Sequence, residues 1–150
     1  MLEELDAFLA AEHYHRCILL VSRDIGLLQR QAEELACYRN WPVLCVGSAL
    51  SAPLISISPR QRSRTAQLLL RRRLDEAAPG PLMCTDIDLL FEPTLQLDPL
   101  ALFRRASRSL PLIVAWPGHY DGGVLSYAVP EHAHYRTWPD PQVRIYLLEQ

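Results

Sequence analysis

Lysine is absent from this sequence of 150 residues, so all fifteen of its Lys and Arg positions are arginine. Without lysine, the chain has no Walker-type side chain to reach nucleotide phosphates, no Schiff-base residue and no lysine general base. A GC-rich coding sequence is one origin of such a bias. Whatever its origin, the absence removes whole classes of mechanism.

Paired cysteines and long apolar runs are absent as well. The cysteines lie singly inside apolar segments, at Cys17, Cys37, Cys45 and Cys84. Because no CxxC pair exists, zinc ribbons and thioredoxin-type motifs are excluded, and we expect buried, reduced thiols. No run approaches the roughly 18 apolar residues of a membrane span, and the acidic N-terminus has no apolar signal-peptide core. We therefore expect a cytoplasmic protein without membrane contact.

Apolar runs alternate with helical patterns along the chain. Hydrophobic content of 49% and a net charge of −2 are typical of a globular protein with no overall attraction to nucleic acid. Buried strands are predicted at 16–21, 43–46, 82–87 and 112–116, with a last strand around 143–147. Helices are predicted over 24–39, over 59–76 and from Asp98–Pro99 onward, after a short opening helix. This alternation predicts one α/β domain over residues 1–150, a three-layer sandwich with a mostly parallel sheet.

Two segments are less regular in this pattern. Residues 48–58 read as a connection or as one further short strand. Residues 117–141 read as an irregular, aromatic C-terminal segment, in which Asp121-Gly122-Gly123 forms a turn and residues 124–128 alternate beside it. Long loops of this kind in compact domains are usually either functional or disordered.

The break after the first predicted strand is where a phosphate-binding loop would lie. Such a loop takes about eight residues, G-x-x-x-x-G-K-[ST], whereas this chain has only Ser22, Arg23 and Asp24 there. Its nearest glycine, Gly26, falls inside the predicted helix. Ser22 or Asp24 is better explained as a helix N-cap. A carboxylate at that position also occupies the helix end that a phosphate would need, and repels it.

The third predicted strand ends in acidic residues, within the stretch PLMCTDIDLLF. An apolar strand that ends in acids is typical of a Walker B strand, whose carboxylate holds a magnesium-bound water. If the extended conformation continues, Asp86 and Asp88 point to the same side. The alternative is that acids at a strand end only mark the protein surface.

The second half of the chain resembles the BrxF family, P-loop-containing proteins of BREX phage-defence systems. The resemblance is carried by TDIDLLFEPTLQLDPLALFRRASRSLPLIVAWPGHYDGGVLSYAVPEHAHYRTWP and by SALSAPLISISPRQR, and covers roughly residues 40–140. It implies a P-loop-NTPase-like fold and membership of a defence complex. The implied partners are a larger ATPase, a DNA methyltransferase and a PglZ-type protein.

The sequence departs from this family at both nucleotide-binding positions. The Walker A glycines, lysine and Ser/Thr are missing from Ser22, Arg23, Asp24 and Gly26. On the family pattern, Thr85 stands where the metal-side aspartate is expected, Asp86 is one position off, and Asp88 takes the acidic position. We therefore expect a non-catalytic subunit that binds no cofactor of its own, with ATP and magnesium held only if another subunit completes the site. A residual ATPase is a more distant alternative.

An arginine-rich helix suggests a second function. Its cations are Arg60, Arg62, Arg64, Arg71, Arg72 and Arg73, with Leu68, Leu69 and Leu74 expected to face the sheet. Such a stripe binds DNA phosphates or an acidic partner, or is simply a solvated helix face. The alternative hypothesis is accordingly a nucleic-acid-binding subunit of the same type of system.

The C-terminal segment contains large amphipathic side chains. Tyr120, Tyr127, Tyr135 and Trp138 are the residue types that anchor protein interfaces, and we expect them to contact a partner protein or a second copy of the chain. His132 and His134 could approach Asp121, but no spacing fixes a third metal ligand. His13 and His15 are expected to end a helix, where side chains two residues apart diverge. No metal site is predicted from them.

Overall fold

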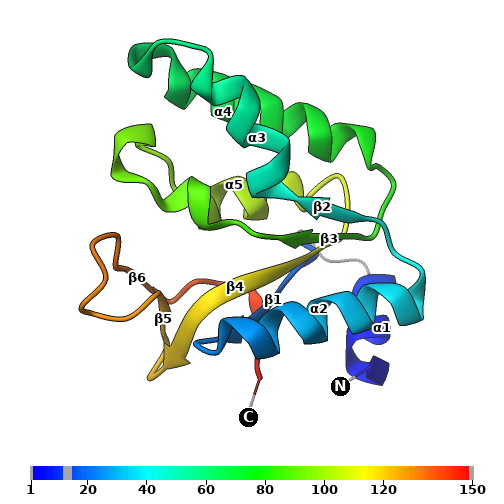
Figure 1. Cartoon of the computed structure of the whole chain (residues 1–150). Coiled ribbons are helices and arrows are strands. Elements are labelled where there is room, and N and C mark those ends of the chain that lie inside the picture. Colours follow the sequence, from blue (N-terminus) through cyan, green and yellow to red (C-terminus); the bar gives the residue numbers. More distant parts are fainter. Residues whose placement is uncertain (1, 12–14, 149–150) are drawn as a thin grey trace.

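A computed structural model describes residues 2–11 and 15–148 of the chain (Figure 1). Two 3₁₀ helices, η1 (Asp88–Phe91) and η2 (Pro93–Leu95), lie between β3 and α5. The α-helices are α1 (Leu2–Ala10), α2 (Ile25–Arg39), α3 (Val46–Ile55), α4 (Pro59–Glu76) and α5 (Pro99–Ala106). The strands are β1 (Cys17–Ser22), β2 (Val43–Cys45), β3 (Leu82–Thr85), β4 (Leu112–Asp121), β5 (Val124–Tyr127), β6 (Arg136–Pro139) and β7 (Arg144–Leu147).

The strands form one seven-stranded sheet in the order β2-β3-β4-β1-β7, with β5 and β6 added beside β4. β1 pairs in parallel with β4 and β7, and β3 pairs in parallel with β2 and β4. Only the β4-β5-β6 extension is antiparallel. The predicted α/β class with a mostly parallel sheet is therefore confirmed.

Helices cover both faces of the sheet, which gives three layers (Figure 1). Ile18 and Leu20 of β1 pack with α1 and α2 on one face, whereas Leu19 and Val21 pack with α3, α4 and α5 on the other. Side chains of a strand alternate between faces, so a central strand must be apolar at every position to bury both. All six residues of β1 are buried.

Residues 48–58 are not a strand, because most of them belong to α3. Val46, Leu50 and Leu54 are its buried residues. Their i, i+4, i+8 spacing is helical, and it extends back into the residues that we assigned to the second strand. Pro53 lies in the last turn of the helix, where it has no N–H to donate to the Ala49 carbonyl, and α3 ends two residues later at Ile55.

The expectation that residues 117–141 are irregular is wrong for the parts that form β4, β5 and β6, whereas residues 128–135 are turns and bends, and the predicted turn at Asp121-Gly122-Gly123 is confirmed. β4 continues through Pro117-Gly118, and a turn at Gly122-Gly123, both with positive φ, leads into β5. A Cβ built on Gly118 would overlap the Ser126 carbonyl of β5, so only glycine allows the two strands to approach there. The Trp116 indole N–H donates to the same carbonyl at 3.0 Å. The proline and glycine that suggested a strand end instead allow the sheet to extend.

Candidate site at the carboxyl edge of the sheet

The loops that follow β1, β2 and β3 meet at one edge of the sheet. α2, which follows β1, lies on one face, whereas α3 and α5, which follow β2 and β3, lie on the other (Figure 1). In open α/β sheets, ligands bind in the crevice at the strand ends where successive connections diverge in this way. β4 lies between β1 and β3, so the two candidate nucleotide-binding positions are not on neighbouring strands.

The corner between β1 and α2 is closed by its own side chains. The Asp24 carboxylate accepts the Leu27 backbone N–H at 3.0 Å, and the Ser22 hydroxyl accepts the Asp24 N–H at 3.0 Å. Asp24 is thus the N-cap of α2, as the sequence predicted, and Gly26 is the second residue of that helix. Arg23 is exposed and lines a neighbouring hollow of the crevice. Two of the N–H groups at this corner, those of Asp24 and Leu27, therefore already have intramolecular partners.

The end of β3 does not continue as the extended strand that we assumed for Asp86 and Asp88. β3 ends at the buried Thr85, Asp86 has a positive φ of 52°, and Asp88 begins η1. A non-glycine residue in this left-handed region is uncommon and needs support from its surroundings. The support comes from Gly47, whose N–H donates to the Asp86 carbonyl at 2.9 Å.

Gly47 lies in the first turn of α3, directly against the Asp86 side chain. A Cβ built on Gly47 would overlap the Asp86 carboxylate. Cys45, the N-cap residue of α3, has no side-chain cap bond, and its thiol donates to Asp86 Oδ2 at 3.5 Å. The Asp86 carboxylate therefore covers the N-terminus of α3 and complements its positive dipole. Gly47 was not among the predicted site residues, although a glycine directly after a predicted strand was an available signal.

Asp88 is held by an aromatic residue from β5. The Tyr127 hydroxyl donates to Asp88 Oδ1 at 2.5 Å, and the Tyr127 ring stacks on Phe91 with centroids 3.7 Å apart. Burial of the phenol, followed by its bond to the Asp88 carboxylate, raises the pKa of Tyr127 above its ordinary value. Asp88 therefore links η1 to the antiparallel extension of the sheet.

Asp86 and Asp88 line the same open cleft at this edge, of about 720 Å³. Glu92 adds a third carboxylate, and Tyr127, His132 and His134 form another wall. The His134 backbone N–H donates to His132 Nδ1 at 2.9 Å, and the two imidazole rings are 5.4 Å apart. Ser48 and Ser51 also line the cleft, which thus has three carboxylates and no arginine among its lining residues, whereas a triphosphate needs cations.

Carboxylates lie at both helix ends that face the crevice, Asp24 at α2 and Asp86 at α3. Within residues 2–11 and 15–148, no three His, Cys, Asp or Glu side chains are placed to hold a metal ion. Asp121 lies at the tip of the β4–β5 hairpin, and His13 lies outside the described residues. His15 is engaged elsewhere, where its Nδ1 donates to the Arg104 carbonyl at 2.7 Å.

The aromatic residues of the C-terminal segment are mostly part of the core. Tyr127 is 3% exposed, and Tyr120 and Trp138 pack against the same interior cluster. Trp138 lies edge-on to Trp116, with centroids 5.2 Å apart, and its indole N–H donates to Asp98 at 3.1 Å. Tyr127 is therefore not a surface anchor. Tyr135, at 37% exposure, is the most accessible of the four.

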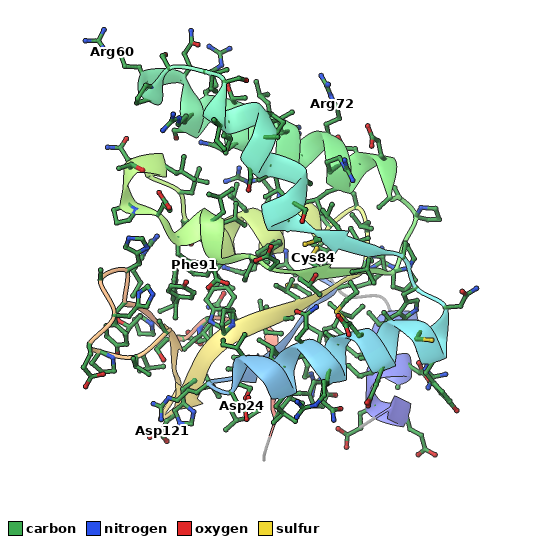
Figure 2. All side chains as sticks on the ribbon, in the orientation of Figure 1. Asp24, Arg60, Arg72, Cys84, Phe91 and Asp121 are labelled. Carbon is green, nitrogen blue, oxygen red and sulfur yellow. The ribbon has the colours of Figure 1, made fainter. Side chains whose placement is uncertain are left out.

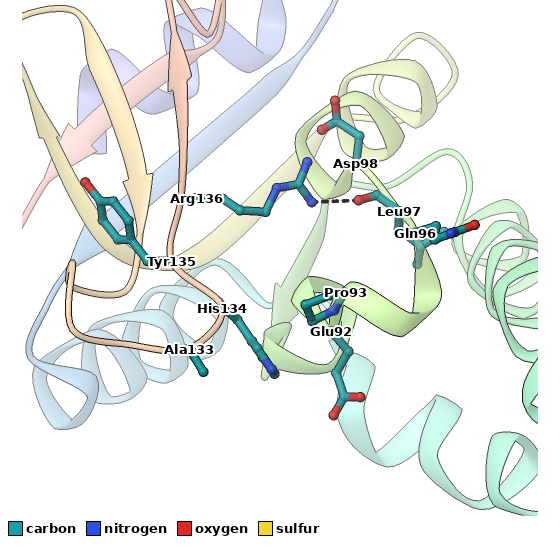
Figure 3. A pocket seen from close by; sticks show the side chains of 9 residues that line it. All are labelled: Glu92, Pro93, Gln96, Leu97, Asp98, Ala133, His134, Tyr135 and Arg136. Carbon is teal, nitrogen blue, oxygen red and sulfur yellow. Dashed lines mark hydrogen bonds between the residues drawn. The ribbon is translucent and has the colours of Figure 1, made fainter.

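Tyr135 lines a second hollow, of about 440 Å³, between the loop before β6 and the segment from η2 to α5 (Figure 3). Arg136 spans these two segments and donates to the Leu97 carbonyl at 2.7 Å (Figure 3). Its guanidinium also lies 4.9 Å from the Trp138 ring centre. Arg136 thus ties the antiparallel extension to the rest of the domain.

The arginine-rich helix is α4, with the bounds that the sequence predicted. Arg60 and Arg72 project away from the sheet (Figure 2). Arg60, Arg64, Arg71, Arg72 and Arg73 are exposed, but Arg62 is half-buried and donates to the Leu54 carbonyl of α3 at 3.0 Å. Arg62 is thus a tether between two helices. The expectation for Leu68 is wrong, because Leu68 is 56% exposed and Ala66, Leu70 and Leu74 form the buried stripe.

Two of the four thiols differ from the expectation of burial. Cys17 and Cys84 are buried, but Cys37 is exposed and Cys45 is half-buried at the crevice. Burial raises the pKa of Cys17 to about 12, so this thiol is protonated near neutral pH.

No protein-family model, curated protein or solved structure matches the chain. In the described part of the chain, none of the helices has the length and apolarity needed to span a bilayer.

Proposed function

We propose that the chain is a non-catalytic subunit with a P-loop-type fold, which acts through protein contacts in a BREX-type phage-defence complex. The sequence resemblance of residues 40–140 and the mostly parallel α/β sheet support this proposal. The partners that the resemblance implies are the larger ATPase, the methyltransferase and the PglZ-type protein of such a system.

One observation carries the non-catalytic part of the proposal. The α2 N-terminus, where a fold of this type would receive phosphate, is capped by the Asp24 carboxylate, and the α3 N-terminus beside it lies against the Asp86 carboxylate. A phosphate charge placed 4 Å from either carboxylate would be repelled by about 4 kcal/mol at an effective dielectric of about 20. No lysine is present to offset this repulsion, and the corner lacks the length of a phosphate-binding loop.

Phage plaque assays on charge-neutral variants in a host carrying the complete defence system test this proposal. Asp86→Asn keeps a side chain that tolerates the left-handed backbone, and Asp88→Asn keeps an acceptor for Tyr127. Both variants remove a charge that a metal-assisted reaction requires. A non-catalytic subunit retains phage protection in both variants, with plaque numbers within about threefold of those with the unaltered protein. Loss of protection at normal protein level and melting temperature would contradict the proposal.

A nucleic-acid-binding function is the second candidate, favoured by the five exposed arginines of α4. Within the described residues, none of these five forms an ion pair. If they bind duplex DNA, replacing Arg60, Arg64 and Arg72 by alanine should reduce the salt slope of binding by about one unit per lost phosphate contact. An unchanged slope, or no DNA binding at low salt, would exclude this role.

A further inference from the structure

A groove between α4 and α5 combines an apolar floor with a cationic rim. Its volume is about 440 Å³, within the range of roughly 300–1,000 Å³ that ligand pockets occupy. The buried side chains of Leu70, Leu74 and Leu110 lie along it, and Leu68 and Leu102 extend the apolar lining toward solvent. This groove lies away from the crevice at the carboxyl edge of the sheet and shares no lining residue with the cleft there.

The charged residues of the groove are mainly positive. Arg71 comes from α4, Arg105 from α5, and Arg108 from the turn after α5, and all three are exposed. Asp75 is the one acidic residue that lines it. Three cations and one anion give this groove an excess of two positive charges, in a chain whose net charge is −2.

We propose that this groove binds an acidic amphipathic helix of a partner protein. Such a helix lays apolar side chains at i, i+3, i+4 and i+7 into a hydrophobic groove, and its flanking carboxylates reach arginines on the rim. The arginines come from two different elements around leucines, so a ligand that follows the groove meets both kinds of contact. Duplex DNA would use the cations but not the leucines, because its outer surface is a phosphate backbone.

This inference rests on the proposed function, since it specifies one of the protein contacts through which the subunit acts. It is nevertheless tested separately. If the groove does not bind an acidic helix, the evidence for the closed phosphate site still stands. If the chain binds nucleotide, the proposed function is wrong, but the evidence for the groove still stands.

The direct test is a fluorescence-anisotropy titration of the full chain with designed helical peptides of about 18 residues, roughly five turns. The probe peptide has leucines at helical spacing flanked by glutamates. One control peptide has lysine in place of every glutamate, and another has the same composition with the leucine spacing scrambled. The acidic peptide should bind at least about tenfold more tightly than either control, and more weakly as salt is raised. Equal binding of the three peptides, or no binding of the acidic one, would overturn the proposal.

Two matched pairs of variants locate the binding site. Arg71→Glu with Arg105→Glu reverses two groove charges, while Arg60→Glu with Arg64→Glu makes the same charge change on exposed α4 residues outside the groove. The groove pair should weaken binding of the acidic peptide at least about tenfold, and the control pair should weaken it less than about threefold. Equal effects of the two pairs would show non-specific attraction and contradict the proposal.

The apolar floor has its own matched control. Leu68→Ser changes a groove residue that is 56% exposed, and Ile55→Ser changes a residue outside the groove that is 75% exposed. Of these two variants, only Leu68→Ser should weaken binding of the acidic peptide. If duplex DNA displaces the peptide and Arg71→Glu with Arg105→Glu abolishes DNA binding as well, the groove serves nucleic acid and the proposal is wrong. If Arg71→Glu with Arg105→Glu instead dissociates a dimer of the chain, the groove binds a second copy of the chain and the proposal is equally wrong.

Discussion

Replacing Trp138 by alanine should destabilise the fold rather than remove a surface anchor. Trp138 is half-buried and lies edge-on to two core rings, with centroids 5.2 Å from Trp116 and 6.0 Å from Phe91. A tryptophan exposes about 150–250 Å² to be buried, and about half of that at about 25 cal/mol per Å² gives about 2–3 kcal/mol. The ring contacts add about 0.5–1 kcal/mol, so we expect a loss of about 3 kcal/mol.

Urea unfolding followed by far-UV circular dichroism measures this loss, which corresponds to a melting temperature lower by about 6–12 °C for a chain of this size. Tyr135→Ala is the matched control, because Tyr135 belongs to the same segment but is 37% exposed. It should cost less than about 1 kcal/mol. If Trp138→Ala lowers the stability by no more than Tyr135→Ala does, Trp138 is not part of the core and our assignment of the antiparallel extension is wrong.

Three further predictions rest on the contacts or the burial of single side chains. Tyr127→Phe should lower the free energy of unfolding by about 1–2 kcal/mol near neutral pH. Because the pKa of Tyr127 is raised in the folded state, its hydroxyl stabilises the fold at pH values below about 10, the ordinary pKa of tyrosine, so the difference between the two proteins should shrink as the pH rises above about 10. Iodoacetamide should label Cys37 in the folded protein, and Cys17 and Cys84 only after unfolding, as followed by mass spectrometry of the digested protein; labelling of the two buried thiols without denaturant would contradict their burial. Asp24→Ala should cost about 1 kcal/mol in urea unfolding and Asp24→Asn a few tenths, and equal costs would exclude the capping role.

The regular part of the fold could be predicted because local and tertiary preferences agree there. α4 begins at Pro59, directly after Ser58, and proline at the first helical position is a strong start signal. The apolar runs of β1 and β3 are long enough to bury both sides of a strand. The Asp24 cap could be predicted because an apolar strand pattern is followed at once by a helical pattern, with Asp24 directly before it.

Local patterns predicted the turn at Gly122-Gly123 and the alternation of β5, but not that β4 continues through Pro117-Gly118 to form an antiparallel extension. Pro117-Gly118 usually ends a strand, but Gly118 is required here because the Ser126 carbonyl of β5 approaches its backbone. Nothing near Gly118 in sequence reports that contact. The same limit hid the position of Asp86, since its left-handed backbone depends on Gly47, which is distant in sequence. Asp86 and Asp88 were thus singled out from the sequence, but the backbone geometry at the end of β3 was not predicted.

Calorimetric titration of the purified chain with ATP and magnesium tests most directly whether Asp24 and Asp86 close the phosphate site. We predict no saturable heat at any ATP concentration up to about 1 mM. Any dissociation constant would then be above about 1 mM, which corresponds to a binding free energy weaker than about −4 kcal/mol. A saturable isotherm with a dissociation constant of about 100 μM or tighter, roughly −5.5 kcal/mol, would contradict the account.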